Sequence, residues 1–208
     1  MNEQRTTRQR RANGEDSRRR ILDAAVEVAT VRGYEGTTIA LVSKISGLPA
    51  SSIYWHFKDK DELIAAVIER SFITWLAAWD VPDGPGPRER ITAMAGQIAK
   101  ALLDSPDFLR LGLMLALERR PVEPRARTMF LAVREQARHR LMDAAREYFP
   151  HLPETAVADF ATYAIAGADG LFIAKEIGGD SVDLLALFDL HARSLYALAV
   201  EMSTPDEP

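Results

Sequence analysis

The segment spanning residues 51–63, SSIYWHFKDKDEL, constrains the fold most, because its apolar and polar residues fall on opposite sides of a short helix. At 100° per residue, Ile53 and Phe57 share one face, whereas Trp55 points the opposite way. Asp59, with a glutamate three residues later, has the pattern of a capping box, which starts a new helix. The segment is therefore expected to be a short, exposed docking helix followed at once by another helix.

Two more helices are predicted upstream of this segment. Residues 17–31 carry apolar side chains at helical spacing, and the glycine-containing stretch 33–36 ends that helix. Thr38 is placed to cap a second helix over residues 39–46, and Gly47 closes it as a C-terminal glycine does. A helix, a glycine turn and a short helix in this order are typical of a helix-turn-helix.

The charges are segregated along the chain. The formal net charge is −4. Residues 1–60 hold 11 Lys and Arg against 7 acids, whereas the remaining 148 residues hold 15 against 23. The basic end is also the helix-turn-helix end, so positive potential is concentrated where DNA phosphates would lie.

Several motifs in this region resemble those of the TetR family of bacterial transcriptional regulators, in the right order and at the right spacing. They are Ile21-Leu22-Asp23-Ala24-Ala25, Gly33-Tyr34, Thr37-Thr38-Ile39, Gly47-Leu48 and Tyr54-Trp55-His56-Phe57-Lys58-Asp59-Lys60. The resemblance covers roughly residues 17–65. It implies an all-α homodimer with an N-terminal DNA-binding domain and a divergent C-terminal domain for ligand binding and dimerisation.

The resemblance also assigns roles to DNA-contacting residues. It implies that Tyr54 and His56 contact phosphates, that Thr38 and Lys60 contact the DNA backbone from neighbouring helix starts, and that Trp55 faces base edges together with two small residues. Because Ile53 and Phe57 already occupy the apolar face, the residues themselves favour exposure of Tyr54 and Trp55. The complete predicted set is Thr38, Ala50, Ser51, Ser52, Tyr54, Trp55, His56, Lys58 and Lys60.

Some of these residues have alternative readings. Ser51 and Ser52 lie in the first turn, where hydroxyls cap a helix or read bases. His56 is nearer the apolar side and is equally suited to a structural hydrogen bond. Pro49 stands where the family commonly has a capping serine, and Ser51 where it has glycine or proline. The operator sequence therefore cannot be transferred from the family.

The rest of the chain is predicted to be helical, which gives an all-α fold of about nine helices. Periodic runs are expected at about 87–103, 106–119, 124–149, 153–177 and 181–201. No strand-like alternation or fixed-period repeat competes with this prediction. The predicted domains are a disordered basic tail (1–16), the helix-turn-helix domain (17–64, with its recognition helix at about 50–56), a connecting helix (65–80), a Pro/Gly linker (81–87) and a regulatory and dimerisation domain (88–208).

The arginine-bearing tail has two interpretations. It contains Arg5, Arg8, Arg10 and Arg11 and shows no apolar periodicity. It either adds phosphate or minor-groove contacts beside the DNA-binding module or is simply solvated.

The last two helices are predicted to form the interface of a homodimer. Their apolar stripes and small residues permit close packing against a second chain, although the same stripes would also serve packing within one chain. Helix-turn-helix proteins bind palindromes as dimers, which favours the interface. The predicted interface residues are Val157, Ala161, Ala164, Ala168, Leu171, Leu184, Phe188, Leu195 and Leu198.

A small, mainly apolar effector is expected, but the sequence points to its site only weakly. Methionine and aromatic side chains line adaptable pockets, although at helical spacing they more often form plain core. The candidate residues are Trp75, Met94, Met114, Phe130, Arg134, His139 and Tyr163.

Other classes of protein find less support in the sequence. There is no cysteine, no Glu-x-x-His motif and no nucleophile elbow, so neither an enzyme nor a metal or cofactor site is predicted. No apolar run of about 20 residues suggests a membrane span, and a cytoplasmic location is expected. The predicted function is an effector-released repressor that binds a palindromic operator; a transcriptional activator, a ligand-independent DNA-binding protein and, more remotely, an all-α enzyme remain alternatives.

Overall fold

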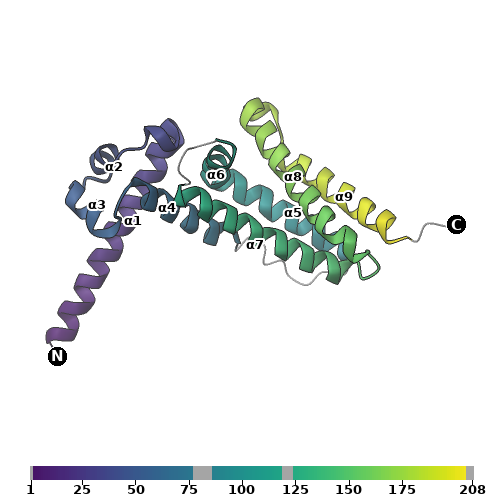
Figure 1. Cartoon of the computed structure of the whole chain (residues 1–208), viewed down its shortest axis with the longest axis horizontal. Helices are drawn as coiled ribbons and strands as arrows, with labels where there is room; N and C mark the ends of the chain where they lie inside the picture. Colours follow the sequence, from purple (N-terminus) through teal and green to yellow (C-terminus); the bar gives the residue numbers. More distant parts are fainter. Residues whose placement is uncertain (1, 77–85, 119–123, 205–208) are drawn as a thin grey trace. The chain divides into compact units, whose positions relative to one another are not determined.

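The computed structural model describes residues 2–76, 86–118 and 124–204. Over these residues it contains nine α-helices, one short 3-10 helix and no strand, which confirms the all-α prediction (Figure 1). The elements are α1 (Asn2–Gly36), α2 (Ile39–Ser46), α3 (Ala50–His56), α4 (Lys60–Leu76), α5 (Pro87–Asp104), α6 (Asp107–Leu117), α7 (Arg125–Tyr148), α8 (Glu154–Gly178), η2 (Gly179–Ser181) and α9 (Leu184–Ser203).

The chain forms two compact units. The first comprises Met1–Phe72 and Asp107–Leu131, and the second comprises Ile73–Pro106 and Ala132–Pro208. Helices α4 and α7 therefore contribute residues to both units. The sequence pattern assigned α6 to the regulatory domain, whereas it packs on α1 in the first unit, a long-range contact that periodicity does not reveal. The expected linker at 81–87 and the end of the expected connecting helix lie mostly or wholly outside the described residues.

The helix-turn-helix elements form as their cap residues predict. Gly33, with φ 66° and ψ −175°, interrupts the helical backbone near the end of α1. The Thr38 hydroxyl accepts a hydrogen bond from the backbone N–H of Leu41 at the start of α2, over 3.3 Å. Gly47 ends α2 in the left-handed conformation, with φ 66° and ψ 17°.

The expected disordered tail is not observed: α1 extends back to Asn2. The tail is rich in Arg, Gln and Glu, which favour helix, and contains no proline. It also continues directly from a helix whose Ile21 and Ala25 are fully buried, so the nucleation cost is already met. Low hydrophobicity alone therefore did not predict the backbone conformation of this segment.

The core of the first unit includes an aromatic cluster. The ring of Phe108 on α6 lies 6.1 Å from that of Phe72 and 5.7 Å from that of Phe130. Gly112 allows the close approach of α6 and α7, because a Cβ there would come within 2.0 Å of the Phe130 ring. These contacts join α6 and the start of α7 to α4.

In the second unit, α9 packs against both α5 and α8. Nε2 of His191 on α9 lies 3.0 Å from the carbonyl oxygen of Ala164 on α8. A Cβ at Gly167 would approach the His191 ring to 2.3 Å, so this glycine is required for the α8–α9 contact. Arg134 on α7 forms a two-pronged ion pair with Asp169 on α8.

Most of the predicted dimer stripe is buried inside the single chain. Six of the nine predicted residues are buried in the core and three are half-buried. Helical periodicity identified an apolar stripe correctly, but it does not show whether the same chain or a partner covers it. The buried six are Val157, Ala161, Ala164, Leu184, Phe188 and Leu195, and the half-buried three are Ala168, Leu171 and Leu198.

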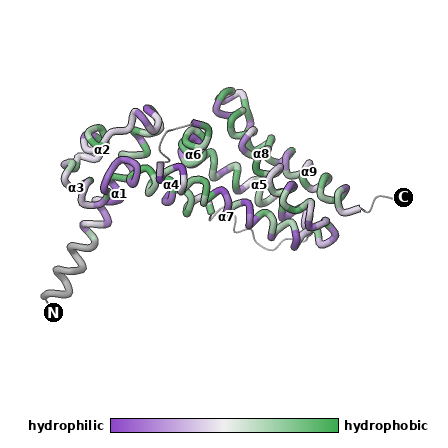
Figure 2. The backbone as a smooth tube through the Cα atoms, in the orientation of Figure 1, coloured by the Kyte–Doolittle hydropathy of each residue, from purple (hydrophilic) through white to green (hydrophobic). Residues whose placement is uncertain are grey.

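Helix α8 is apolar on more than its packed side. Hydrophobic residues continue along α8 and α9 (Figure 2). By length and composition alone, the helical stretch Glu154–Ser181 is long and apolar enough to cross a membrane, which contradicts the expectation that no such run exists. Only 28% of its most apolar window is buried within the chain. A helix that is apolar on all sides is normally covered on all sides.

Candidate nucleic-acid interface

Helix α3 has one buried face and one exposed face, as the sequence predicted. Ile53 is fully buried and the adjoining Phe57 is 3% exposed, which fixes the helix to the rest of the first unit. Tyr54 and Trp55 are 57% and 76% exposed. Large aromatic side chains at such exposure have no role in the core of this unit. They form the projecting surface of the helix-turn-helix.

The first turn of α3 is not capped by a side chain. Pro49 occupies the N-cap position, and the backbone N–H of Ser52 donates to the Pro49 carbonyl over 2.9 Å. Neither serine hydroxyl of this turn is used as a cap, and contact with DNA stays a prediction for both residues. Ala50 and Ser52 are half-buried, whereas Ser51 is exposed.

His56 lies at the edge of the exposed face. Its ring meets that of Trp55 edge-on, with the centroids 4.5 Å apart. Burial lowers the pKa of His56, and the nearby positive charge of Arg18 lowers it further. The lowered pKa favours the neutral imidazole, which can donate one N–H to a phosphate oxygen.

The start of α4 is capped by the acids that the sequence singled out. Oδ1 of Asp59 accepts from the N–H of Glu62 over 2.8 Å, and Oε2 of Glu62 accepts from the N–H of Lys58 over 2.8 Å. This is the reciprocal arrangement of a capping box, except that the glutamate reaches one residue further back than usual. The Lys58 side chain is exposed beside it.

Lys60 is held in place by Tyr34 at the end of α1. Its Nζ lies 4.4 Å from the centre of the Tyr34 ring and donates to the Tyr34 carbonyl over 3.2 Å. A weaker ion pair joins Nζ to Glu35 over 3.5 Å. The ammonium group is thus positioned at the α1–α4 junction, and it has a third donor available for a phosphate. Thr38 is exposed, and its hydroxyl proton is likewise not used by its cap bond.

Asp61 links this surface to α7, and sequence reasoning missed it. Its Oδ2 accepts from the N–H of Arg125 over 2.7 Å, and its Oδ1 accepts from the N–H of Ala126 over 3.2 Å. The Tyr34 hydroxyl donates to the same Oδ1 over 3.1 Å. Asp61 therefore caps α7 while it holds Tyr34, the residue that positions Lys60. An acid in the first turn of a helix usually complements its own helix dipole, so the local pattern does not predict this role.

A second tie joins α1 to α6. The Thr30 hydroxyl, which also bonds to the Val26 carbonyl, lies 2.6 Å from Oδ1 of Asp107. Asp107 is the first residue of α6 and forms an ion pair with Arg110 one turn later. This contact joins α6 to α1, and the Asp61 contacts join α7 to α4.

The candidate effector residues belong to both units of the chain. Met114 and Phe130 belong to the first unit, where Phe130 is core and Met114 is 48% exposed. In the second unit, His139 has a 61% exposed side chain beside Glu135, and Tyr163 is 56% exposed. Arg134 is paired with Asp169, while Trp75 and Met94 are half-buried.

Two cavities are formed by other residues. One, of about 370 Å³, lies between α1 and α3. The other, of about 280 Å³, lies where α7 and α9 end and includes Tyr148, His151 and Val200. Among the described residues, no three His, Asp or Glu side chains are grouped so as to hold a metal ion.

These features of the first unit match a known family. The family model for bacterial regulatory proteins, tetR family, matches residues 21–67, which contain α2, α3 and the start of α4. Residues 21–67 therefore form a TetR-family DNA-binding region. The TetR-family match thus covers the exposed aromatic pair and its flanking Thr38 and Lys60.

Curated TetR-like relatives share part of their length with this chain. The HTH-type transcriptional regulator SrpR of Pseudomonas putida is 37% identical over 57 residues, which are 27% of this chain and 27% of SrpR. AcrR of Shigella flexneri is 33% identical over 64 residues, which are 31% of this chain and 30% of AcrR. The chain therefore spans less than a third of these relatives in the matched stretch.

Solved structures extend the likeness to nearly the whole chain. The TetR regulator tylP of Streptomyces fradiae is 25% identical, with a TM-score of 0.66 over 90% of this chain and 91% of tylP. A transcriptional regulator from Aquifex aeolicus VF5 is 20% identical, with a TM-score of 0.70 over 88% of this chain and 99% of its own. The likeness of fold therefore extends to the C-terminal helices.

Proposed function

We propose that this chain is a cytoplasmic, TetR-family DNA-binding repressor that occupies a palindromic operator as a homodimer and is released by a small, mainly apolar effector. The observation that carries the DNA-binding part is the exposed Tyr54–Trp55 pair on a helix whose opposite face is fully buried. Thr38 and Lys60 flank it at two helix starts, where backbone N–H groups suit phosphate oxygens. Backbone contacts would position α3, and its few exposed residues would specify the sequence.

Selection from a pool of random double-stranded DNA tests this proposal. The full-length protein should enrich an inverted repeat whose half-sites are centred about one or two helical turns apart, because each protomer presents one α3. Sequencing the enriched pool measures the result, and genomic footprinting then locates the regulated genes. Enrichment of no shared sequence at physiological salt would contradict specific operator binding.

The exposed apolar stripe on α8 is the surface that we assign to the dimer. Tyr163, Ile173 and Ile177 are 56%, 42% and 83% exposed, and they recur at helical spacing with Ala166 and Gly170 between them. A Cβ at Gly170 would meet no atom within 4 Å in this chain, so a partner helix has room to approach closely. Leu190 and Val200 on α9 are 52% and 45% exposed. Covering these stripes with a second copy also accounts for the apolar residues of α8 beyond its packed side.

Charge substitutions on this stripe should separate the protomers. We expect Ile173→Glu combined with Ile177→Glu to convert a dimer into a monomer at micromolar concentration, because two carboxylates per chain would be buried unpaired in the interface. Light scattering measures the mass. Leu103→Glu on α5, at a residue 40% exposed, is the matched control and should remain dimeric. A wild-type monomer, or wild-type binding to lipid vesicles through α8, would contradict the assignment.

The effector part rests on a buried polar atom in the second unit. Among the described residues, Oε1 of Gln97 on α5 is buried and has no hydrogen-bond partner. An unsatisfied buried amide oxygen is costly, and a donor on a bound molecule would relieve that cost. A ligand that carries one donor group would satisfy this atom.

Release requires that the effector favour a form of the protein that binds DNA poorly. A change from almost fully bound to almost fully free needs about a 10⁴-fold preference for that form. Helices α4 and α7 each have residues in both units, and Asp61 hydrogen-bonds the start of α7 to α4. A displacement of the start of α7 would thus reach Tyr34 through the Asp61 carboxylate, and Tyr34 in turn contacts Lys60.

A further inference from the structure

We propose that Arg20 on α1 is a positioning residue, which fixes the turn between α2 and α3 and, through that turn, the base-reading end of α3. The inference deepens the proposed operator binding and rests on it. Nη2 of Arg20 donates to the Ser46 carbonyl over 2.7 Å, although the two residues lie 26 positions apart in the chain. Ala50, the first residue of α3, follows shortly after Ser46. Arg20 therefore acts on α3 from outside the set of residues predicted to contact DNA.

The Ser46 carbonyl is a suitable acceptor for a cation. Ser46 is the last residue of α2, and the final carbonyls of a helix have no partner within that helix. These carbonyls also carry the negative end of the helix dipole, so a guanidinium group forms a charge-assisted hydrogen bond there. A Cβ at Gly47 would lie 3.4 Å from Nη2 of Arg20. The guanidinium group therefore lies against the turn itself.

Two serine side chains also hold this turn. The Ser43 hydroxyl donates to the Leu48 carbonyl over 2.7 Å. The Ser46 hydroxyl, on a residue that is 7% exposed, accepts from the Leu48 N–H over 3.3 Å. The serines join the turn to α2, whereas Arg20 joins it to α1, where the neighbouring Ile21 is fully buried in the core. The turn is therefore fixed to both preceding helices.

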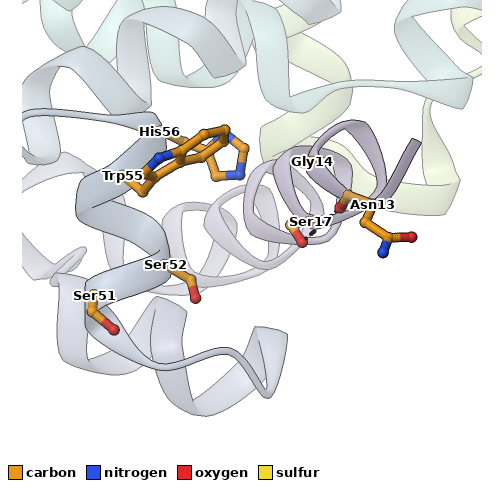
Figure 3. A pocket seen from close by; sticks show the side chains of 7 residues that line it. All are labelled: Asn13, Gly14, Ser17, Ser51, Ser52, Trp55 and His56. Carbon is orange, nitrogen blue, oxygen red and sulfur yellow. Dashed lines mark hydrogen bonds between the residues drawn. The ribbon is translucent and has the colours of Figure 1, made fainter. Parts of the chain in front are cut away.

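Helix α3 depends on this contact because a groove separates part of it from α1. The groove has a volume of about 370 Å³, and Figure 3 shows Ser52 and Trp55 of α3 on one wall with α1 on the other. Arg18, also on α1, holds the opposite end of α3, since its guanidinium lies 5.4 Å from the centre of the ring of Phe57, the residue after α3. Loss of the Arg20 contact would therefore let the first turn of α3 shift, although the other end of the helix stays held.

Replacement of Arg20 by methionine in the full-length protein tests the proposal. Methionine keeps an unbranched apolar stem and a similar helix propensity but removes the charged donor. Arg20→Met should lower the ratio of operator affinity to scrambled-duplex affinity about tenfold, on the order of one lost base contact. The slope of log K against log salt should stay at the wild-type value, because no phosphate contact is lost. Fluorescence anisotropy with both duplexes at several salt concentrations gives the ratio and the slope.

Arg19→Met is the matched control, since it removes the same charge from the adjacent residue of α1. The guanidinium of Arg19 pairs with Asp16 rather than with the turn, and both side chains are largely exposed. Such a pair contributes little to stability, so the affinity ratio should stay within about twofold of the wild type.

Ser43→Ala loosens the same turn without a change of charge. It should also lower the affinity ratio, because the Leu48 carbonyl loses its donor. The double variant Arg20→Met, Ser43→Ala should lose less than the product of the two single effects, since both side chains hold one turn. Amide exchange at Leu48 should accelerate severalfold in each variant, and circular dichroism melting checks that each variant is folded at the temperature of the titrations.

The outcomes separate this inference from the proposed function. A general loss of stability would lower both affinities alike, so an unchanged ratio in Arg20→Met would overturn the positioning role. A salt slope lowered by about 1 would overturn it too, because that result identifies a direct phosphate contact. Failure of the wild-type protein to enrich any operator would instead contradict the proposed function.

Discussion

Trp55→Ala should reduce affinity for the selected operator about 100-fold while leaving binding to unrelated DNA almost unchanged. The indole is 76% exposed on α3, so its removal costs contacts with DNA rather than with the core. A base contact contributes on the order of 1–3 kcal/mol, and a dimer would lose one such contact in each half-site. Titration of labelled operator and scrambled duplex by fluorescence anisotropy gives both affinities.

Lys58→Ala supplies the contrasting control for that experiment. Lys58 is exposed just before α4 and belongs to the predicted DNA-contacting set, and we expect its ammonium group to contact the DNA backbone. Its loss should weaken binding to all duplexes alike and reduce the slope of log K against log salt by about 1 per lost contact. Trp55→Ala should leave that slope unchanged. Equal loss of operator and scrambled binding in Trp55→Ala would remove the indole from base reading.

The helix-turn-helix could be predicted from the sequence because its signals are local. Capping residues, the glycine at the end of α2 and the two-faced pattern of α3 all lie within a few residues of the features that they determine. The structure buries Ile53 and exposes Tyr54 and Trp55 as that pattern indicates. Where the local pattern and the tertiary packing favour the same structure, the sequence is sufficient to predict that structure.

The remaining features depend on contacts between distant residues. Periodicity identified apolar stripes on α8 and α9, but the buried side belongs to this chain and Tyr163 and Ile177 lie on the uncovered side. Asp61 resembled an ordinary first-turn acid, and only the fold places the start of α7, 64 residues later, against it. Methionines and aromatics suggested an effector site, yet Phe130 and Met114 fall in the first unit. Tertiary packing decides which surfaces come into contact. The helical wheel of a single segment carries no information about that packing.

Asp61→Ala should destabilise the first unit by about 2 kcal/mol, because two backbone N–H groups of α7 and the Tyr34 hydroxyl lose one charged acceptor. Native-state hydrogen exchange is the suitable measurement, since a chain with two units need not unfold in one step. Exchange should accelerate first at the start of α7. Tyr34→Phe should have a smaller effect, about 1 kcal/mol, because only one of the three hydrogen bonds is removed.

Asp23→Ala is the matched control for Asp61→Ala, since it also removes an aspartate that ties α4 to α1. Oδ1 of Asp23 accepts from Arg70 over 2.7 Å, but the aspartate side chain is 61% exposed. An exposed pair of this kind contributes about 0–1 kcal/mol, so exchange at α7 should hardly change.

The Asp61 carboxylate should couple operator binding to the start of α7. If Asp61 couples the two, operator binding slows amide exchange at Thr128 and Met129 in the wild-type protein and in Asp23→Ala, but not in Asp61→Ala. The coupling is reciprocal, so any molecule that displaces the start of α7 would weaken DNA binding through the same contact. Protection of α7 by operator in the Asp61→Ala variant would show that the signal travels by another route, through α6 and Thr30 or along α4 itself.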